Sequence, residues 1–435
     1  MFLRYSSFKL FLRDLRDSNW RERIALILFA FATFHAAFLL PAGNMFAGER
    51  AKMATGLICA LSFWASCFLV KKDGQWKSGE SIVSVALVAL MAISCAFAAD
   101  PLTSFSRGFV IASSALGGFW GARRLLDTLP RRAMFLWYAL IIFTVIQVIG
   151  IVNYFHGEPV EHLLDSNPHP FVGRVMLLWF APLTLFAGKK KGLTILGLLL
   201  LLASYPVVFL SKLISAAFMP FAIGAVALLA GIMRIRYFFS LLIIAILAVI
   251  CFFSFFPHKK LKLIGHEPVF YRAENYPFSW HLAKKHPFVG IGLRTDRKPY
   301  LDDYEMKFPL VSKYNFVKST YRTITSENTI LSFMAEVGLP FTLLYAFSVF
   351  YLYFRLIGKV KKPDPQRVFP PLAIFLALTS GMLHNMLYDG IYHPQVSWFF
   401  HLLLGLIPVW PWRGRGLNGT QNGGNGTVPE TSGQS

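Results

Sequence analysis

The sequence predicts an all-α integral membrane protein with about twelve transmembrane helices, because apolar runs of spanning length follow one another along the chain. Of the 435 residues, 55% are hydrophobic and only 15% are charged. A soluble domain is about 25% charged. A helix needs about 20 mostly apolar residues to cross the hydrocarbon core of a bilayer. We therefore expect a polytopic membrane protein.

The apolar runs begin after a basic N-terminal segment, 1–23, which we expect to be cytoplasmic. They are 24–40, 53–70, 82–99, 105–120, 133–151, 170–186, 193–210, 214–232, 237–256, 328–354, 370–387 and 396–410. They place nine spans within 24–256 and three within 328–412. A cleaved signal peptide is the alternative for the first run, but that run is long for a signal core and many more follow.

The basic residues indicate the orientation. The formal net charge is +21, and most Lys and Arg of the short loops fall on the side that holds the N-terminus. These basic loops are 71–77, 123–132, 189–191, 234–236, 355–367 and 413–415. Because short cytoplasmic loops are enriched in Lys and Arg, both termini should be cytoplasmic. The positive charge then reflects topology, and we expect no nucleic-acid partner.

Two segments differ from the short loops. Segment 257–327 is long, falls on the external side between spans nine and ten, and is the candidate for function because long loops in compact proteins usually carry it. The tail 413–435 is rich in Gly, Asn, Ser and Thr. It has little apolar content to bury, so we expect a disordered cytoplasmic tail. The four cysteines lie in apolar runs and are expected to be packing residues.

Several charged residues map to the external ends of spans. Arg174, Lys212 and Arg272 are cations there, and Glu327 with Asn328 opens span ten. Each alone could be an interfacial residue whose charge reaches out to water, and Glu327 could simply favour a helix N-terminus. Together the cations suggest a diphosphate ligand, for which a lipid diphosphate is the natural candidate. The carboxylate could take a proton from an incoming hydroxyl.

The long segment also holds aromatic and histidine side chains, among them Trp280 and His286. Such aromatics line sugar sites but also populate membrane interfaces. The spacing of His281 and His286 is poor for zinc and no HExxH or CxxC is present, so we expect no metal. No Walker loop or GxGxxG fingerprint occurs, so we expect no cofactor.

Three motifs then resemble the bacterial O-antigen ligases and their Wzy-type polymerase relatives. The first runs from Arg272 through Trp280 to the HPFVGIG sequence at 286–292. It resembles the family pattern of an Arg, a Trp and then His-Pro followed by a G-x-G. The second is NTILSFMAEVG at 328–338, which resembles the family segment that opens the helix after the large loop. The third, LSKLISAAF at 210–218, occupies the place of a Ser-Arg-Gly-like segment.

The resemblance implies metal-independent, inverting transfer of a glycan from undecaprenyl diphosphate to a hydroxyl, in the bacterial inner membrane with the site facing the periplasm. It makes Glu327, Arg272 and Lys212 the candidate catalytic residues. The candidate substrate-binding residues are Arg174, Asn328, Trp280, His286 and Glu336. The acceptor would be lipid A-core for a ligase, in lipopolysaccharide biosynthesis, or another lipid-linked glycan for a polymerase.

Two departures from the ligase pattern keep these alternatives open. Glu327 stands where ligases commonly have a His, and some polymerase relatives carry a carboxylate there. Lys212 stands where they have an Arg, which keeps the charge but loses bidentate geometry. A secondary transporter is the alternative to a glycan transferase. The major facilitator type, however, places its long loop in the cytoplasm after span six, so transport is the weaker expectation.

Overall fold

The computed structural model describes residues 8–39, 49–70, 79–162, 164–165, 167–186, 191–211, 213–232, 266–301, 303–305, 326–361 and 370–407, with isolated positions between 235 and 243. Within this part of the chain the regular elements are all helical, and no strand occurs. The predicted all-α class is therefore confirmed for the described residues. Lys212 and most of the predicted run 237–256 lie outside them.

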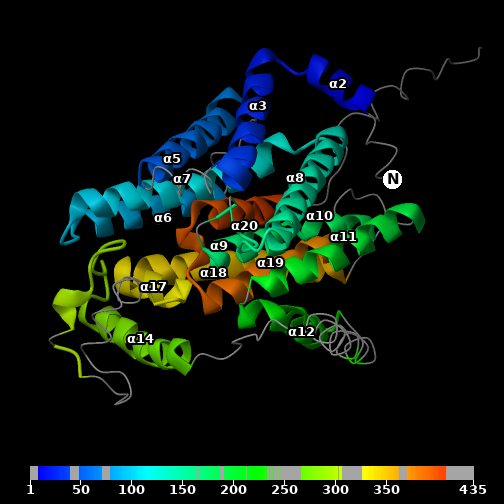
Figure 1. Ribbon diagram of the computed structural model, residues 1–435. Coiled ribbons are helices and arrows are strands. Elements are labelled where there is room, and N and C mark those ends of the chain that lie inside the picture. Colours follow the sequence, from blue (N-terminus) through cyan, green and yellow to red (C-terminus); the bar gives the residue numbers. More distant parts are fainter. Residues whose placement is uncertain are drawn as a thin grey trace, which may run out of the picture.

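The α-helices follow the order shown in Figure 1. Their bounds are α2 Phe8–Asp17, α3 Trp20–Phe34, α5 Glu49–Trp64, α6 Gly79–Ala96, α7 Pro101–Leu125, α8 Leu129–Phe155, α9 Pro168–Leu178, α10 Phe180–Phe186, α11 Lys191–Leu210, α12 Ile214–Leu229, α14 His266–Lys285, α17 Thr329–Glu336, α18 Leu339–Val360, α19 Pro371–Leu387 and α20 Pro394–Leu406. Short π-helical turns, η1 His35–Leu39 and η2 Ala65–Leu69, extend α3 and α5. The 3-10 turns are η4 Lys298–Tyr300 and η5 Gly390–Tyr392.

Six described helical segments are long and apolar enough to cross a membrane. They are Arg50–Leu69, Gly79–Ala96, Leu129–Phe155, Pro168–Phe186, Lys191–Val208 and Leu339–Val360. Large apolar side chains on the outer faces of these helices stay exposed, for example Leu57, Ile141 and Phe347, which is 69% exposed. Lipid is the solvent in which such a surface is stable. The chain is therefore a membrane protein, while a count of twelve spans stays a prediction.

Helix interruptions explain part of the difference between the predicted apolar runs and the six described helical segments that are long enough to cross a membrane. The predicted run 328–354 is divided into α17 and α18 at Val337 and Gly338, where the backbone of Gly338 has φ +95°. The described helices α19 and α20 are apolar but short, at 17 and 13 residues. Helix α7 spans 25 residues. It carries Arg107 within the helix and two further arginines, Arg123 and Arg124, in its last turn. Hydropathy alone does not locate such breaks.

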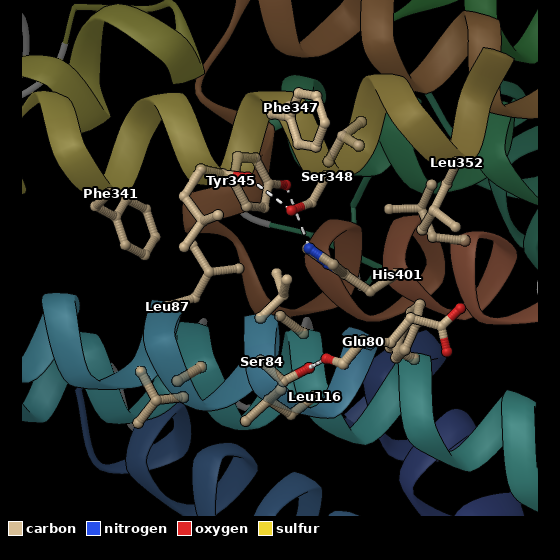
Figure 2. Close-up of a pocket in the computed structure, with 18 of the residues that line it drawn as sticks. Glu80, Ser84, Leu87, Leu116, Phe341, Tyr345, Phe347, Ser348, Leu352 and His401 are labelled. Atoms are coloured by element: carbon tan, nitrogen blue, oxygen red, sulfur yellow. Dashed lines mark hydrogen bonds between the residues drawn. The ribbon is translucent and has the colours of Figure 1, made fainter. Parts of the chain in front are cut away.

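An apolar groove of about 580 Å³ lies between α6 and α18, with α7 and α20 contributing to its lining. Figure 2 shows α18 on one side of this groove, α6 on the other and His401 of α20 between them. In its middle, the hydroxyl of Tyr345 lies 3.2 Å from Nε2 of His401. Most of the remaining lining side chains are apolar.

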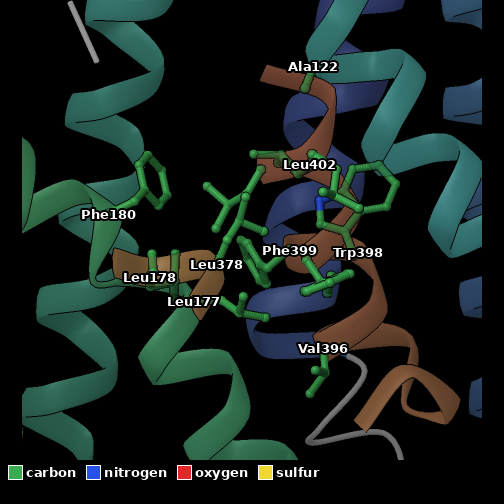
Figure 3. Close-up of a cluster of buried hydrophobic side chains, with 14 of the residues drawn as sticks. Ala122, Leu177, Leu178, Phe180, Leu378, Val396, Trp398, Phe399 and Leu402 are labelled. Carbon is green, nitrogen blue, oxygen red and sulfur yellow. The ribbon is translucent and has the colours of Figure 1, made fainter. Parts of the chain in front are cut away.

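Helices α7 and α20 pack in close contact at the centre of the protein. A Cβ at Gly118 would collide with the backbone of Trp398, and a Cβ at Gly405 would collide with Phe119. Small residues let two helices approach in this way. The Trp398 side chain is fully buried, and its Nε1 donates to Oγ1 of Thr33 at 3.3 Å. Figure 3 shows the surrounding apolar side chains, drawn from α7, α9, α10, α19 and α20.

Polar contacts define two opposite ends of the helix bundle. At one end, Arg131 is 4% exposed and pairs with Asp14, Glu22 and Asp127, with its Nε 2.6 Å from Asp14 Oδ2. These contacts join α2 and α3 to the start of α8. At the other end, α14 packs against α17. Figure 1 shows α2 and α14 far apart on the molecule. The basic loop 123–132 and the described part of the long segment therefore lie in different parts of the protein.

Candidate functional site

The two motif segments 286–292 and 335–339 pair with each other through their backbones. The amide of Ile291 donates to Ala335 O and the amide of Gly292 to Glu336 O, each at 2.9 Å. The amide of Leu339 donates to Pro287 O at 2.7 Å. These two sequence motifs, which are distant along the chain, therefore form one structural unit.

Glycines make this close approach possible. Gly290, Gly292 and Gly338 all have positive φ angles, of 65°, 98° and 95°. Such angles are costly for residues with a Cβ. A Cβ at Gly290 would also collide with the backbone of Glu336, and one at Gly338 would collide with Phe288 O. These positions need glycine both for conformation and for space.

The paired segments are anchored to two helices of the bundle. The Ser94 hydroxyl of α6 lies 2.6 Å from Val289 O and 3.0 Å from Glu336 O. The Ser104 hydroxyl of α7 accepts a hydrogen bond from the amide of Leu293 at 2.8 Å. The unit is therefore held at a fixed position against the helix bundle.

Glu336 lies at the centre of the unit as half of a buried ion pair. Its Oε1 lies 2.7 Å from Nη2 of Arg297, and both side chains are fully buried. Its Oε2 accepts from the amide of Arg294 at 3.0 Å, while Arg297 also donates to Ser279 at 2.9 Å. A buried charge requires such partners. This arrangement makes Glu336 a structural centre of the unit.

Arg294 connects this unit to the segment between α19 and α20. Its backbone has φ +55°, and its Nη2 lies 3.2 Å from Asp389 Oδ2. Its guanidinium carbon lies 4.7 Å from the centre of the Tyr392 ring, in a cation–π contact. Three segments distant in the sequence therefore meet at Arg294.

Arg272 and Glu327 form an ion pair beside this unit. Nε of Arg272 lies 2.6 Å from Oε2 of Glu327, and the two side chains are 29% and 23% exposed. The pair is therefore partly accessible, in contrast to the fully buried pair of Arg297 and Glu336. An external ligand could reach it without unfolding the surrounding structure.

Glu327 is held in a strained backbone conformation with φ +52°. Next to it, Asn328 caps α17 by accepting from the amide of Leu331 at 3.0 Å. The Asn328 side chain also donates to Met386 O at 2.8 Å. A non-glycine residue with positive φ costs about 1–2 kcal/mol and persists where the surroundings enforce it. The contacts of Asn328 supply that enforcement and fix the direction of Glu327.

Tyr276 of α14 lies close enough to Arg272, Glu327 and Asn328 to interact with them electrostatically. Burial raises the pKa of Tyr276, and the Glu327 carboxylate adds to the rise, against the opposing effects of Arg272 and Asn328. The phenol therefore keeps its proton at neutral pH. In the sequence, Tyr276 is one of several aromatic residues of the long segment.

Aromatic and histidine rings stack next to the same site. The ring of His169 stacks on Tyr388 at 4.2 Å between centroids, and the Tyr388 hydroxyl lies 2.9 Å from Nε2 of His393. Burial raises the pKa of Tyr388, and the Asp389 and Glu327 carboxylates contribute. Burial and the Arg294 guanidinium hold the pKa of His393 well below its usual range. His393 is thus uncharged at neutral pH. His169, Tyr388 and His393 were not predicted as site residues.

The other predicted residues take different places. Arg174 is fully buried in α9, with Nη1 2.7 Å from Ala37 O and Nη2 3.2 Å from Leu164 O. Trp280 is 45% exposed on α14, where Nζ of Lys284 lies 5.6 Å from its ring centre. His286 contacts the ring of Tyr300 edge-on at 5.6 Å. Lys212 lies outside the described residues.

Among the predicted residues that the structure describes, it therefore gathers Arg272, Glu327 and Asn328 into one constellation and places Glu336 in the adjacent support. Arg174 contacts backbone carbonyls within the bundle instead. In the described part of the chain, no three His, Cys, Asp or Glu side chains lie together so as to hold a metal ion.

No protein-family model matches the chain, and no curated protein matches it either. The constellation itself is therefore the basis for the function. A guanidinium, a carboxylate and a protonated phenol at a partly exposed site could bind an anionic group and move one proton.

Proposed function

We propose that the chain is a membrane glycosyltransferase of the O-antigen ligase type, which transfers a glycan from undecaprenyl diphosphate to a hydroxyl of lipid A-core. The observation that supports this most is the 2.6 Å contact between Arg272 and Glu327. The two residues are 55 positions apart. Arg272 opens the first motif of the resemblance, and Glu327 directly precedes the second. A donor-binding cation and a proton acceptor therefore lie within one substrate's reach.

Arg272 binds the donor diphosphate in this proposal. A guanidinium suits phosphate oxygens because it offers several N–H donors in one plane. As the bond between the anomeric carbon and the diphosphate oxygen breaks, negative charge grows on the leaving diphosphate. Arg272 stabilises that charge. Loss of one such electrostatic contact costs about 2.7–4 kcal/mol in other enzymes.

Glu327 accepts the proton of the acceptor hydroxyl. The acceptor oxygen then forms its bond to the anomeric carbon from the face opposite the leaving group, which inverts the configuration. The proton ends on a Glu327 carboxylate oxygen and the bonding electrons of the broken bond stay on the diphosphate. Tyr276, which stays protonated, and Asn328 orient the reacting groups beside this carboxylate.

The ion pair itself implies an order of binding. Glu327 and a diphosphate would both be anionic partners for Arg272, so a bound donor weakens the contact between Arg272 and Glu327. The carboxylate is then available to the acceptor hydroxyl. Donor binding should therefore precede productive acceptor binding.

A Wzy-type polymerase is the second candidate, with another lipid-linked glycan as its acceptor. It is favoured by the presence of a carboxylate, Glu327, at the place where ligases commonly have a His. Both candidates place the protein in the bacterial inner membrane with the site facing the periplasm. Neither requires a cofactor.

Reconstitution tests the proposal and separates the two acceptors. Purified protein in detergent should transfer a defined glycan from its undecaprenyl diphosphate donor without any ion gradient. Lipid A-core and a lipid-linked repeat unit are supplied in parallel reactions. Arg272→Ala should reduce turnover at least about 100-fold. The matched control is Lys285→Ala, which removes a cation of the same helix that pairs with Asp303 at 2.8 Å near the surface.

The control variant should keep its turnover. Full activity of a folded Arg272→Ala protein would contradict the proposed site. Failure of transfer to both acceptors, combined with gradient-driven uptake of a substrate into sealed vesicles, would instead favour a transporter.

A further inference from the structure

Among the described residues, the charged side chains that line the groove between α6 and α18 lie at one of its ends. Glu80 and Arg123 pair there, and Arg355 of α18 also lines that end. Arg355 is close enough to interact electrostatically with both residues. At the other end the lining consists of apolar side chains such as Phe333, Phe341 and Met91. The groove is thus amphipathic along its length.

The charged end carries a net positive charge. Two arginines face one carboxylate, and Nη1 of Arg123 is buried without a hydrogen-bond partner among the described residues. An unsatisfied buried guanidinium nitrogen is costly. An additional acceptor, such as a phosphate oxygen, would give this nitrogen a hydrogen bond.

The length of the groove corresponds to one leaflet of a bilayer. The lining of α6 runs from Gly79 to Met91, which is roughly 18 Å at the rise of an α-helix. The lining of α18 runs from Phe341 to Arg355, which is roughly 21 Å. Half of a hydrocarbon core is about 15 Å. An acyl chain would fill the groove, with its headgroup at the arginines.

The groove is also oriented away from the proposed transfer site. Ser94, near the end of α6, contacts Val289 of the paired motif unit, while Glu80 begins the same helix. Likewise, α18 starts next to Pro287 and has Arg355 near its other end. A donor whose diphosphate binds Arg272 would have its charged group at the wrong end of this groove.

We infer that the groove between α6 and α18 binds an anionic phospholipid of the leaflet on the side of α2, with its phosphate at Arg123 and Arg355 and an acyl chain along the apolar lining. Charge complementarity selects the headgroup, because one basic residue near a membrane surface favours an anionic lipid by about 1 kcal/mol. The inference does not depend on the proposed transferase activity.

Native mass spectrometry of the full chain, released from detergent, tests this inference. The probes are phosphatidylglycerol and phosphatidylcholine with identical acyl chains. The parent should retain phosphatidylglycerol preferentially. Arg355→Gln should lower its occupancy about fivefold. Glu80→Gln should raise it, because it removes the competing carboxylate. Ser348→Trp, which fills the groove at a lining position, should lower the retention of both lipids.

The control is Arg16→Gln, which removes an arginine of α2 that is 79% exposed and outside the groove. Equal retention of the two lipids by the parent, or equal losses in Arg355→Gln and Arg16→Gln, would overturn the inference. So would retention of a polyprenyl phosphate, in place of phosphatidylglycerol, that depends on Arg355. These variants leave Arg272 and Glu327 intact, so transferase activity can be scored separately on the same samples.

Discussion

Replacement of Glu327 by Gln distinguishes a catalytic role of this carboxylate from a structural one. The substitution keeps the shape of the side chain and an oxygen that can accept from Nε of Arg272, but it removes the basicity. The side chains of this ion pair are 29% and 23% exposed. Pairs near the surface contribute only about 0–1 kcal/mol to stability. We therefore expect the variant to fold and to melt close to the parent temperature.

The effect on turnover should be much larger than the effect on stability. A general base typically contributes about 10²–10⁴-fold to rate, so Glu327→Gln should lose activity on that scale. Donor binding should be retained or strengthened, because Arg272 no longer pairs with a competing carboxylate. The assay is transfer in detergent from the lipid-linked donor, with donor binding measured separately.

A second substitution at the same position relieves the backbone strain of Glu327. Glu327→Gly removes both the carboxylate and the φ +52° penalty, which is about 1–2 kcal/mol for a residue with a Cβ. This variant should be at least as stable as the parent and should also be inactive. Asp303→Asn, which removes a carboxylate that is 68% exposed, is the matched control. Parental turnover by Glu327→Gln or Glu327→Gly would refute the role of Glu327 as base.

Three further predictions concern the buried unit around Glu336 and the orientation of the chain in the membrane. Glu336→Gln should lower the free energy of unfolding by about 3–5 kcal/mol, because it leaves the buried Arg297 without its counter-charge; an unchanged unfolding transition would contradict this. Gly338→Ala should destabilise the protein for two reasons: the new Cβ would collide with the backbone carbonyl of Phe288, and the backbone at this position has a positive φ. Thermal melting measures the loss. A rise in melting temperature would count against the packing argument. A cysteine at Lys298 should react with a membrane-impermeant thiol reagent in spheroplasts, whereas one at Lys361 should not; reversed labelling would overturn the predicted orientation.

The sequence alone determined the class of protein. Long runs of apolar residues can be stable as helices in lipid whatever their neighbours are, because each helix satisfies its own backbone hydrogen bonds. The sequence assigned Arg272 and Glu327 to the same predicted side of the membrane, whereas their ion pair appears only in the structure. Their charges would be costly in hydrocarbon, so their position along the chain already restricts where they can lie.

The tertiary structure decided which polar residues share the site and which hold it in place. Glu336 was predicted to bind substrate, and its contacts with Arg297 and Arg294 make it the centre of a buried support. Arg174, which looked like an external cation, donates to backbone carbonyls inside the bundle. The break of span ten at Gly338 depends on the facing segment at Pro287. Each of these outcomes rests on partners distant in the sequence, and the energy of a buried charge or a strained backbone depends on those partners more than on the residue itself.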